Sequence, residues 1–118
     1  MKPDELKRLL AKPKRNKYGA VKEEYNGRVY HSKKEANFAR NLDLKITAGI
    51  IKFWHPQKEL KLIVNGALIC KYIIDFYVCY TDNSDAWIEV KGKETPDWRI
   101  KFKLAMALYP GYTFIVEK

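Results

Sequence analysis

The chain has 118 residues, of which 47% are hydrophobic, so it is long enough for one domain with a buried core. It carries 23 Lys and Arg against 14 Asp and Glu, a formal net charge of +9 at pH 7. No run approaches the roughly 20 apolar residues of a membrane span. The two cysteines form neither a disulfide framework nor a zinc-ligand spacing. The sequence therefore predicts a cytoplasmic protein with no membrane partner.

Positive charge is concentrated near the N-terminus. Residues 1–34 hold 11 Lys and Arg and 4 Asp and Glu, net +7, whereas residues 35–118 hold 12 and 10, net +2. This distribution predicts a basic arm over residues 1–17 and a single domain over residues 18–118. Such an arm is typical of a protein that binds a phosphate backbone, because each neutralised phosphate releases counterions. A solubilising tail is the alternative interpretation.

Two elements are predicted before residue 50. Residues 18–30 read as a hairpin, because Asn26-Gly27 favours the positive φ angles of a tight turn. Ser32 to Ala48 reads as a helix with Ser32 as N-cap and Glu35 as its capping-box partner. The residues that repeat at helical spacing and are predicted to face the core are Phe38, Ala39, Leu42 and Ile46.

The second part of the chain is rich in strand patterns. The predicted strands are Ile50 to Trp54, Lys58 to Val64, Ala67 to Tyr80, Ala86 to Lys91 and Tyr112 to Lys118. A helix begins at Thr95-Pro96, with Thr95 as its cap, and stops at Pro110-Gly111. The last strand can return parallel to Ala86 to Lys91 through this helical crossover. The order predicts an α/β fold with a central mixed sheet flanked by helices.

Acidic residues inside apolar strands are the most informative feature for function. Asp75 is the only acid in its strand, where an unpaired carboxylate is costly. Glu89 and Lys91 are two residues apart and therefore point to the same side of theirs. If the two strands are antiparallel neighbours, Asp75 and Glu89 lie side by side and repel unless a divalent cation neutralises them. Oxygen ligands of this kind suit Mg²⁺ or Mn²⁺.

Such a site suits phosphodiester hydrolysis. The ion polarises the phosphate and lowers the pKa of a bound water, and Lys91 orients that water or offsets charge in the transition state. Structural alternatives remain open at this stage. Asp75 can pair with Lys71 or Lys91, and Glu89 with Lys91 can form an exposed strand pair.

Ile74-Asp75 followed by Glu89-Val90-Lys91 resembles the motif of the PD-(D/E)XK nuclease superfamily, with Ile74 where the motif has Pro. The Ser-x-x-Glu helix, Gln57 before a strand, and Thr95-Pro96 before a Lys-rich helix are similar to a family of short phage-encoded proteins. That family is related to endonuclease I type Holliday junction resolvases. The resemblance covers roughly Tyr30 to Lys118.

The resemblance implies a restriction-endonuclease-like αβββαβ core and a Mg²⁺- or Mn²⁺-dependent DNA endonuclease. It implies that Asp75 and Glu89 bind the metal, that Lys91 is catalytic, and that Glu35 is a further catalytic ligand, unless Glu35 only caps its helix. Branched or duplex DNA, a homodimer, DNA recombination and the host cytoplasm follow from the same resemblance. The alternatives are a catalytically inactive nucleic-acid-binding module with the same fold and a structural phage protein.

Basic residues near these elements are the candidates for contact with nucleic acid. Gln57 and Thr95 are weaker candidates for the site, as a contact to water or phosphate and as a helix cap. The predicted nucleic-acid-binding residues are Lys12, Lys14, Arg15, Lys17, Lys33, Lys34, Lys93 and Lys101.

Overall fold

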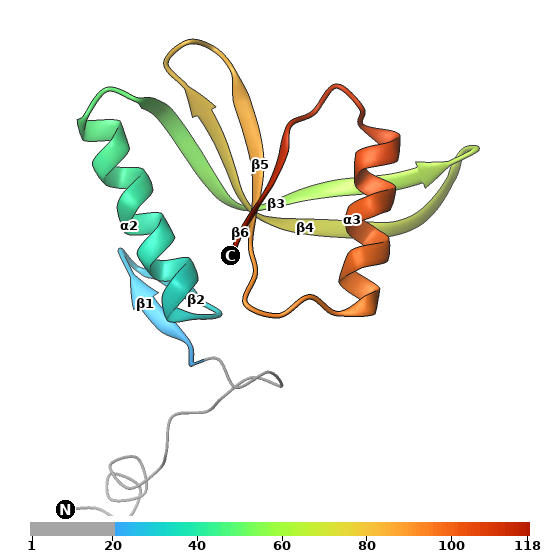
Figure 1. Ribbon diagram of the computed structural model, residues 1–118, viewed down its shortest axis with the longest axis horizontal. Helices are drawn as coiled ribbons and strands as arrows, with labels where there is room; N and C mark the ends of the chain where they lie inside the picture. The colour runs from blue at the N-terminus through green and yellow to red at the C-terminus, as the bar shows by residue number, and fades with distance from the viewer. Residues whose placement is uncertain (1–20) are drawn as a thin grey trace, which may run out of the picture.

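The computed structural model describes residues 21–118 (Figure 1). Strands β1 (Glu23–Tyr25) and β2 (Arg28–Tyr30) pair antiparallel as a two-stranded sheet. Asn26 and Gly27 have φ angles of 51° and 80° in the turn between them. These positive values are the ones a two-residue hairpin loop requires, so the predicted hairpin is confirmed.

Helix α2 (Lys33–Thr47) follows, with Ser32 as its N-cap as predicted. The Ser32 hydroxyl accepts a hydrogen bond from the Glu35 amide at 3.1 Å. Ala39 and Leu42 are buried, but the prediction that Ile46 faces the core is wrong, since 39% of its surface is exposed. The buried residues of α2 all lie between Glu35 and Leu42, so its last turn extends beyond the core.

The main sheet has four strands in the order β3-β4-β5-β6. The first two pairings are antiparallel and the last, β5 with β6, is parallel, as the helical crossover predicted. The fold is thus α/β with a mixed sheet and two flanking helices, compatible with a restriction-endonuclease-like core. The elements are β3 (Ile51–Val64), β4 (Ala67–Tyr80), β5 (Asp85–Val90), α3 (Pro96–Leu108) and β6 (Phe114–Glu117).

The prediction of two separate strands over residues 50–54 and 58–64 is wrong. A single strand, β3, runs through His55-Pro56-Gln57 and stays paired with β4 on both sides of it. Proline is tolerated because β3 is an edge strand, where a missing N–H need not break a ladder. Within this strand Gln57 adopts a φ of 55°, in the left-handed region.

The two helices cover opposite faces of the sheet (Figure 1). Along β5, Ile88 and Val90 belong to the hydrophobic cluster under α2, while Trp87 belongs to the cluster under α3. Alternate residues of a strand point to opposite faces, so each face of β5 has its own core.

The long β3–β4 hairpin passes from one of these cores to the other. Phe76 and Val78 lie in the α2 cluster, whereas Tyr72 and Ile74, which have the same strand parity, lie in the α3 cluster. The twist of β4 therefore reverses its core-facing side between Ile74 and Phe76, at Asp75. The turnover places Asp75 between the two hydrophobic layers.

Candidate active site

Asp75 and Glu89 lie side by side on neighbouring strands. The β4–β5 register pairs Phe76 with Ile88. The next two residues, Asp75 and Glu89, are consequently opposite one another and project from the same face. Only 3% of the Glu89 surface is exposed, and Asp75 is half-buried. The alternative that Glu89 is one half of an exposed strand pair is therefore wrong.

The strands β4 and β5 separate at this pair. Their ladder ends at Phe76 and Ile88, and beyond it the Val90 amide donates to Asp75 Oδ2 at 2.9 Å. The carboxyl group thus takes the place that a backbone carbonyl would occupy in a continuing ladder. This hydrogen bond satisfies the amide and fixes the orientation of the Asp75 side chain.

Burial governs the ionisation of both carboxyl groups. It raises the pKa of Glu89 to about 8, with the negative charge of Asp75 as the second cause. Burial also raises the pKa of Asp75, against the hydrogen bond from Val90. The two carboxyl groups approach closely enough to share a hydrogen bond, and the proton in that bond belongs to the pair. Without a cation the pair therefore shares one proton near neutral pH.

Lys91 lies at the end of β5, on the same side as Glu89 and half-buried. Its Nζ is 5.2 Å from the ring centroid of Trp98, a cation–π distance. Burial raises the pKa of Asp75, Glu89 and Glu35, and the charge of Lys91 lowers all three. The ammonium group is therefore within electrostatic range of every acid in the site.

Glu35 reaches the site from the first turn of α2 and is 8% exposed. Burial raises its pKa to about 7, with the charge of Asp75 as the second cause, while a hydrogen bond from the His31 backbone lowers it. Its Oε2 is buried and has no hydrogen-bond partner. The Glu35 carboxyl group thus bonds to His31 instead of closing the predicted capping box on Ser32, and one of its oxygens faces the interior unsatisfied.

The oxygen donors of this acid pair are of the kind that hard divalent cations prefer. Asp75 and Glu89 supply carboxylate oxygens at one point, and Mg²⁺ commonly takes one or two carboxylates and completes its shell with water and phosphate. Within residues 21–118, no group of three or more His, Cys, Asp or Glu side chains is spaced to hold one ion. Glu35 is therefore not gathered into a ligand cluster with Asp75 and Glu89.

Asp75 does not need Lys71 as a structural partner. The Lys71 Nζ lies 3.8 Å from Glu59 Oε1 in an exposed ion pair on the β3–β4 hairpin. Two residues apart on β4, Lys71 and Ile73 are exposed, while Asp75 is half-buried at the turnover. The compensation of the Asp75 charge comes instead from the Val90 amide, Glu89 and Lys91.

Gln57 lies beside the site in the β3–β4 register, a position that the sequence indicated only weakly. The flanking pairs Pro56 with Phe76 and Lys58 with Ile74 place Gln57 opposite Asp75 across the β3–β4 pair. Its φ of 55° is uncommon for a residue other than glycine and costs conformational energy. The signal in the sequence was Pro56 before a polar residue inside a strand pattern. Thr95 has the structural role predicted for it, since its hydroxyl accepts from the Trp98 amide at 3.2 Å.

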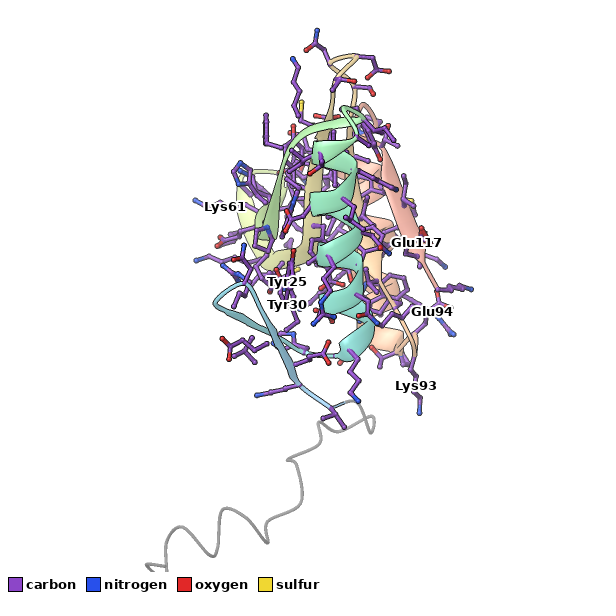
Figure 2. All side chains as sticks on the ribbon, turned by 90° about the vertical axis from the view of Figure 1, so that its left-hand side faces the viewer. Tyr25, Tyr30, Lys61, Lys93, Glu94 and Glu117 are labelled. Carbon is purple, nitrogen blue, oxygen red and sulfur yellow. The ribbon has the colours of Figure 1, made fainter. Side chains whose placement is uncertain are left out.

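The candidate nucleic-acid contacts lie in four parts of the chain. Lys33 and Lys34 are exposed at the start of α2, and Lys93 is exposed between β5 and α3, where Figure 2 shows it projecting from the domain. Lys101 lines a cavity of about 330 Å³ together with Tyr72 and Trp98, so it lies near the site. The remaining predicted contacts lie outside the described residues: Lys12, Lys14, Arg15 and Lys17.

The fold and the site define an α/β domain with a buried acid pair and a lysine where two central strands separate. Residues 15–117 match the family described as "Protein of unknown function (DUF1064)", and the chain belongs to this family. No curated protein and no solved structure matches the chain. Neither described helix is long and apolar enough to cross a membrane.

Proposed function

We propose that this protein is a Mg²⁺- or Mn²⁺-dependent endonuclease of the PD-(D/E)XK type that hydrolyses DNA phosphodiester bonds. The observation that carries the proposal is the close approach of the half-buried Asp75 carboxyl group and the buried Glu89 carboxyl group, near the ammonium group of Lys91. A buried acid pair destabilises a fold unless it holds a proton or a cation. A domain with two hydrophobic clusters has no structural need for such a pair, so its presence favours a catalytic role.

Each residue of the site has a distinct role in this proposal. Asp75 and Glu89 hold the ion through their carboxylate oxygens. When bound, Mg²⁺ polarises a phosphate oxygen and lowers the pKa of an attacking water. Lys91 offsets the negative charge that develops on the phosphate in the transition state. Glu35, with its unsatisfied oxygen, accepts a hydrogen bond from water on the α2 side of the site.

In our proposal, lysines around this site bind the phosphate backbone of DNA. Lys33, Lys34, Lys93 and Lys101 are all exposed in the structure, and the basic segment before residue 21 adds further charge. Each neutralised phosphate releases counterions, so affinity for DNA falls steeply with added salt. Fluorescence anisotropy at increasing salt concentration measures this slope. A slope near zero would show that DNA is not the partner.

The preferred substrate is branched DNA, and this refinement is supported by the resemblance to Holliday junction resolvases alone. Symmetric cleavage of a four-way junction needs two active sites, so we propose a homodimer acting in DNA recombination in the cytoplasm of a phage host. Analytical ultracentrifugation tests the dimer, with and without a junction. A comparison of cleavage on a junction, a linear duplex and supercoiled plasmid tests the substrate.

The decisive experiment is cleavage of these DNAs with Mg²⁺, Mn²⁺ or EDTA, using wild type and Lys91→Ala. Wild type is expected to cut only with metal, and Lys91→Ala is expected to be slower by at least about 100-fold. Lys61→Ala, which removes an exposed lysine on the β3–β4 hairpin, is the matched control and retains activity. Equal activity of wild type and Lys91→Ala would mean that the cleavage comes from a contaminant.

The inactive nucleic-acid-binding module is the rival, and metal binding separates the two. Isothermal titration calorimetry of wild type with Mn²⁺ is expected to show one site, lost in Asp75→Asn. DNA binding without metal binding and without cleavage would favour the rival.

A further inference from the structure

Tyr72 connects the acid pair to helix α3. It lies on β4, three residues before Asp75, and only 4% of its surface is exposed. Trp98 Nε1 donates to the Tyr72 hydroxyl oxygen at 2.9 Å. The same hydroxyl group faces the carboxyl group of Glu89 closely enough to share a hydrogen bond with it. Since the hydroxyl accepts from Trp98, its own proton is directed at Glu89.

This hydrogen-bond chain runs in one direction. The indole N–H is a donor only, so the Tyr72 oxygen must be the acceptor in the bond from Trp98. A phenol has an ordinary pKa of about 10, so it carries its proton at neutral pH. Tyr72 is consequently a permanent hydrogen-bond donor to Glu89.

Trp98 makes a second contact that matters to the site. Its ring, 5.2 Å from Lys91 Nζ, is the cation–π partner of that ammonium group. The position of Trp98 is fixed from both sides, by the bond from its amide to the Thr95 hydroxyl and by a stacking contact with Phe102 at 5.0 Å between ring centroids. One residue of α3 thus contacts the side chain that holds Glu89 and also contacts Lys91.

We infer that Tyr72 is a positioning residue that orients the Glu89 carboxylate toward the metal ion. Trp98, which contacts both Tyr72 and Lys91, fixes the positions of these two side chains relative to each other. The inference deepens the proposed function and rests on it, because it treats Glu89 as a metal ligand. Glu89 and Lys91 then both depend on α3 for their positions, although neither belongs to it.

The physical reason is that a carboxylate ligand has two oxygens and a rotatable end. A donor fixed on one oxygen leaves the other free for the ion and prevents rotation away from it. Partners of this type raise metal affinity, and their loss typically weakens binding about 10- to 100-fold. Within the described residues, the polar partners of the Tyr72 hydroxyl are Trp98 and Glu89.

Calorimetric titration of the full-length protein with Mn²⁺ tests the inference. Tyr72→Phe, which removes only the hydroxyl, is expected to weaken Mn²⁺ binding about 10- to 100-fold. The matched control is Tyr77→Phe, which removes a hydroxyl from the same strand. Tyr77 donates to Asp85 Oδ2 at 2.8 Å, outside the site, so this variant is expected to bind within about twofold of wild type.

A second variant keeps the test decisive if Tyr72→Phe does not fold. Trp98→Phe keeps an aromatic ring near Lys91 but removes the N–H that orients Tyr72, and it is expected to weaken Mn²⁺ binding by a smaller factor than Tyr72→Phe. The indole N–H resonance of Trp98 is a further readout. Mg²⁺ is expected to shift this resonance in wild type and not in Tyr72→Phe.

The outcomes separate the inference from the function on which it rests. If wild type does not bind Mn²⁺ or Mg²⁺, the metal site fails and the inference fails with it. If wild type binds the ion and folded Tyr72→Phe binds it equally well, the inference alone is overturned. Equal weakening in Tyr72→Phe and Tyr77→Phe would also overturn it, because the loss would then be general.

Discussion

The Val90 amide donates to Asp75 Oδ2 at 2.9 Å where β4 leaves β5. A sheet that stayed paired would have used that amide in its ladder and left no room for an acid. Because β4 turns over at Asp75, its carboxyl group enters the gap and meets Glu89 on the next strand. The site is therefore a consequence of how the sheet divides between its two hydrophobic clusters.

The metal-free protein should lose stability as the pH rises from 5 to 8.5. Burial raises the pKa of Glu35 to about 7 and of Glu89 to about 8, both above the 4.5 of an exposed glutamate. The folded state then holds protons more tightly than the unfolded state. This stabilisation is complete below pH 4.5 and is lost as the pH rises through 7 and 8, by at most about 1.4 kcal/mol per pH unit for each group.

Urea unfolding in EDTA at several pH values measures this loss. Glu89→Gln, which cannot ionise, is expected to flatten the upper part of the profile, while Glu24→Gln at an exposed position of β1 should leave it unchanged. A free energy of unfolding that is constant or rises across this pH range would contradict the raised pKa values of Glu35 and Glu89 in the folded state.

Divalent cations should stabilise the fold in a manner that depends on Asp75. An ion that binds only the folded state at 100 times its Kd adds about 2.7 kcal/mol to the free energy of unfolding. Because the ion replaces a shared proton, its affinity should increase with pH, by at most about tenfold per unit for one proton released. Thermal unfolding with Mg²⁺ measures both effects. Asp75→Asn should unfold at one temperature with or without the ion.

Gln57 offers a test of strain at the site. Its φ of 55° is the left-handed conformation that glycine adopts readily, so Gln57→Gly should leave the stability unchanged or raise it by about 1 kcal/mol. Gln57→Ala keeps the strained backbone and serves as the control. A contact of the Gln57 side-chain amide with the site would make both Gln57→Gly and Gln57→Ala less active, although only Gln57→Gly relieves the backbone strain. A clear loss of stability in Gln57→Gly would contradict this explanation.

Phe76 should be the most costly truncation in the α2 core. It is fully buried and contacts the rings of Tyr30, Phe38 and Trp54. Phe76→Ala should lower the free energy of unfolding by about 3–5 kcal/mol. Ile63→Ala, on the exposed tip of the β3–β4 hairpin, is the control and should change it by less than about 1 kcal/mol. Equal losses in the two variants would contradict the assignment of the core.

The sequence by itself determined the local elements and the identity of the acids. The Asn26-Gly27 turn, the Ser32 and Thr95 caps and the parallel return of the last strand were all predictable, because each depends on neighbouring residues or on the short connections between them. The adjacency of Asp75 and Glu89 followed from one assumption, an antiparallel pairing across a short turn, which the structure confirms.

Tertiary structure alone decided what surrounds those acids. The continuity of β3 through Pro56, the placement of Gln57 opposite Asp75, and the bonds from Tyr72 and Val90 come from a twist that moves one hairpin between two cores. An alternating strand pattern predicts which face of the sheet each side chain lies on. It does not predict the residue at which a long strand turns its buried face from one hydrophobic cluster to the other. That point depends on where α2 and α3 pack against the sheet, and such long-range packing leaves no periodic signal in the sequence.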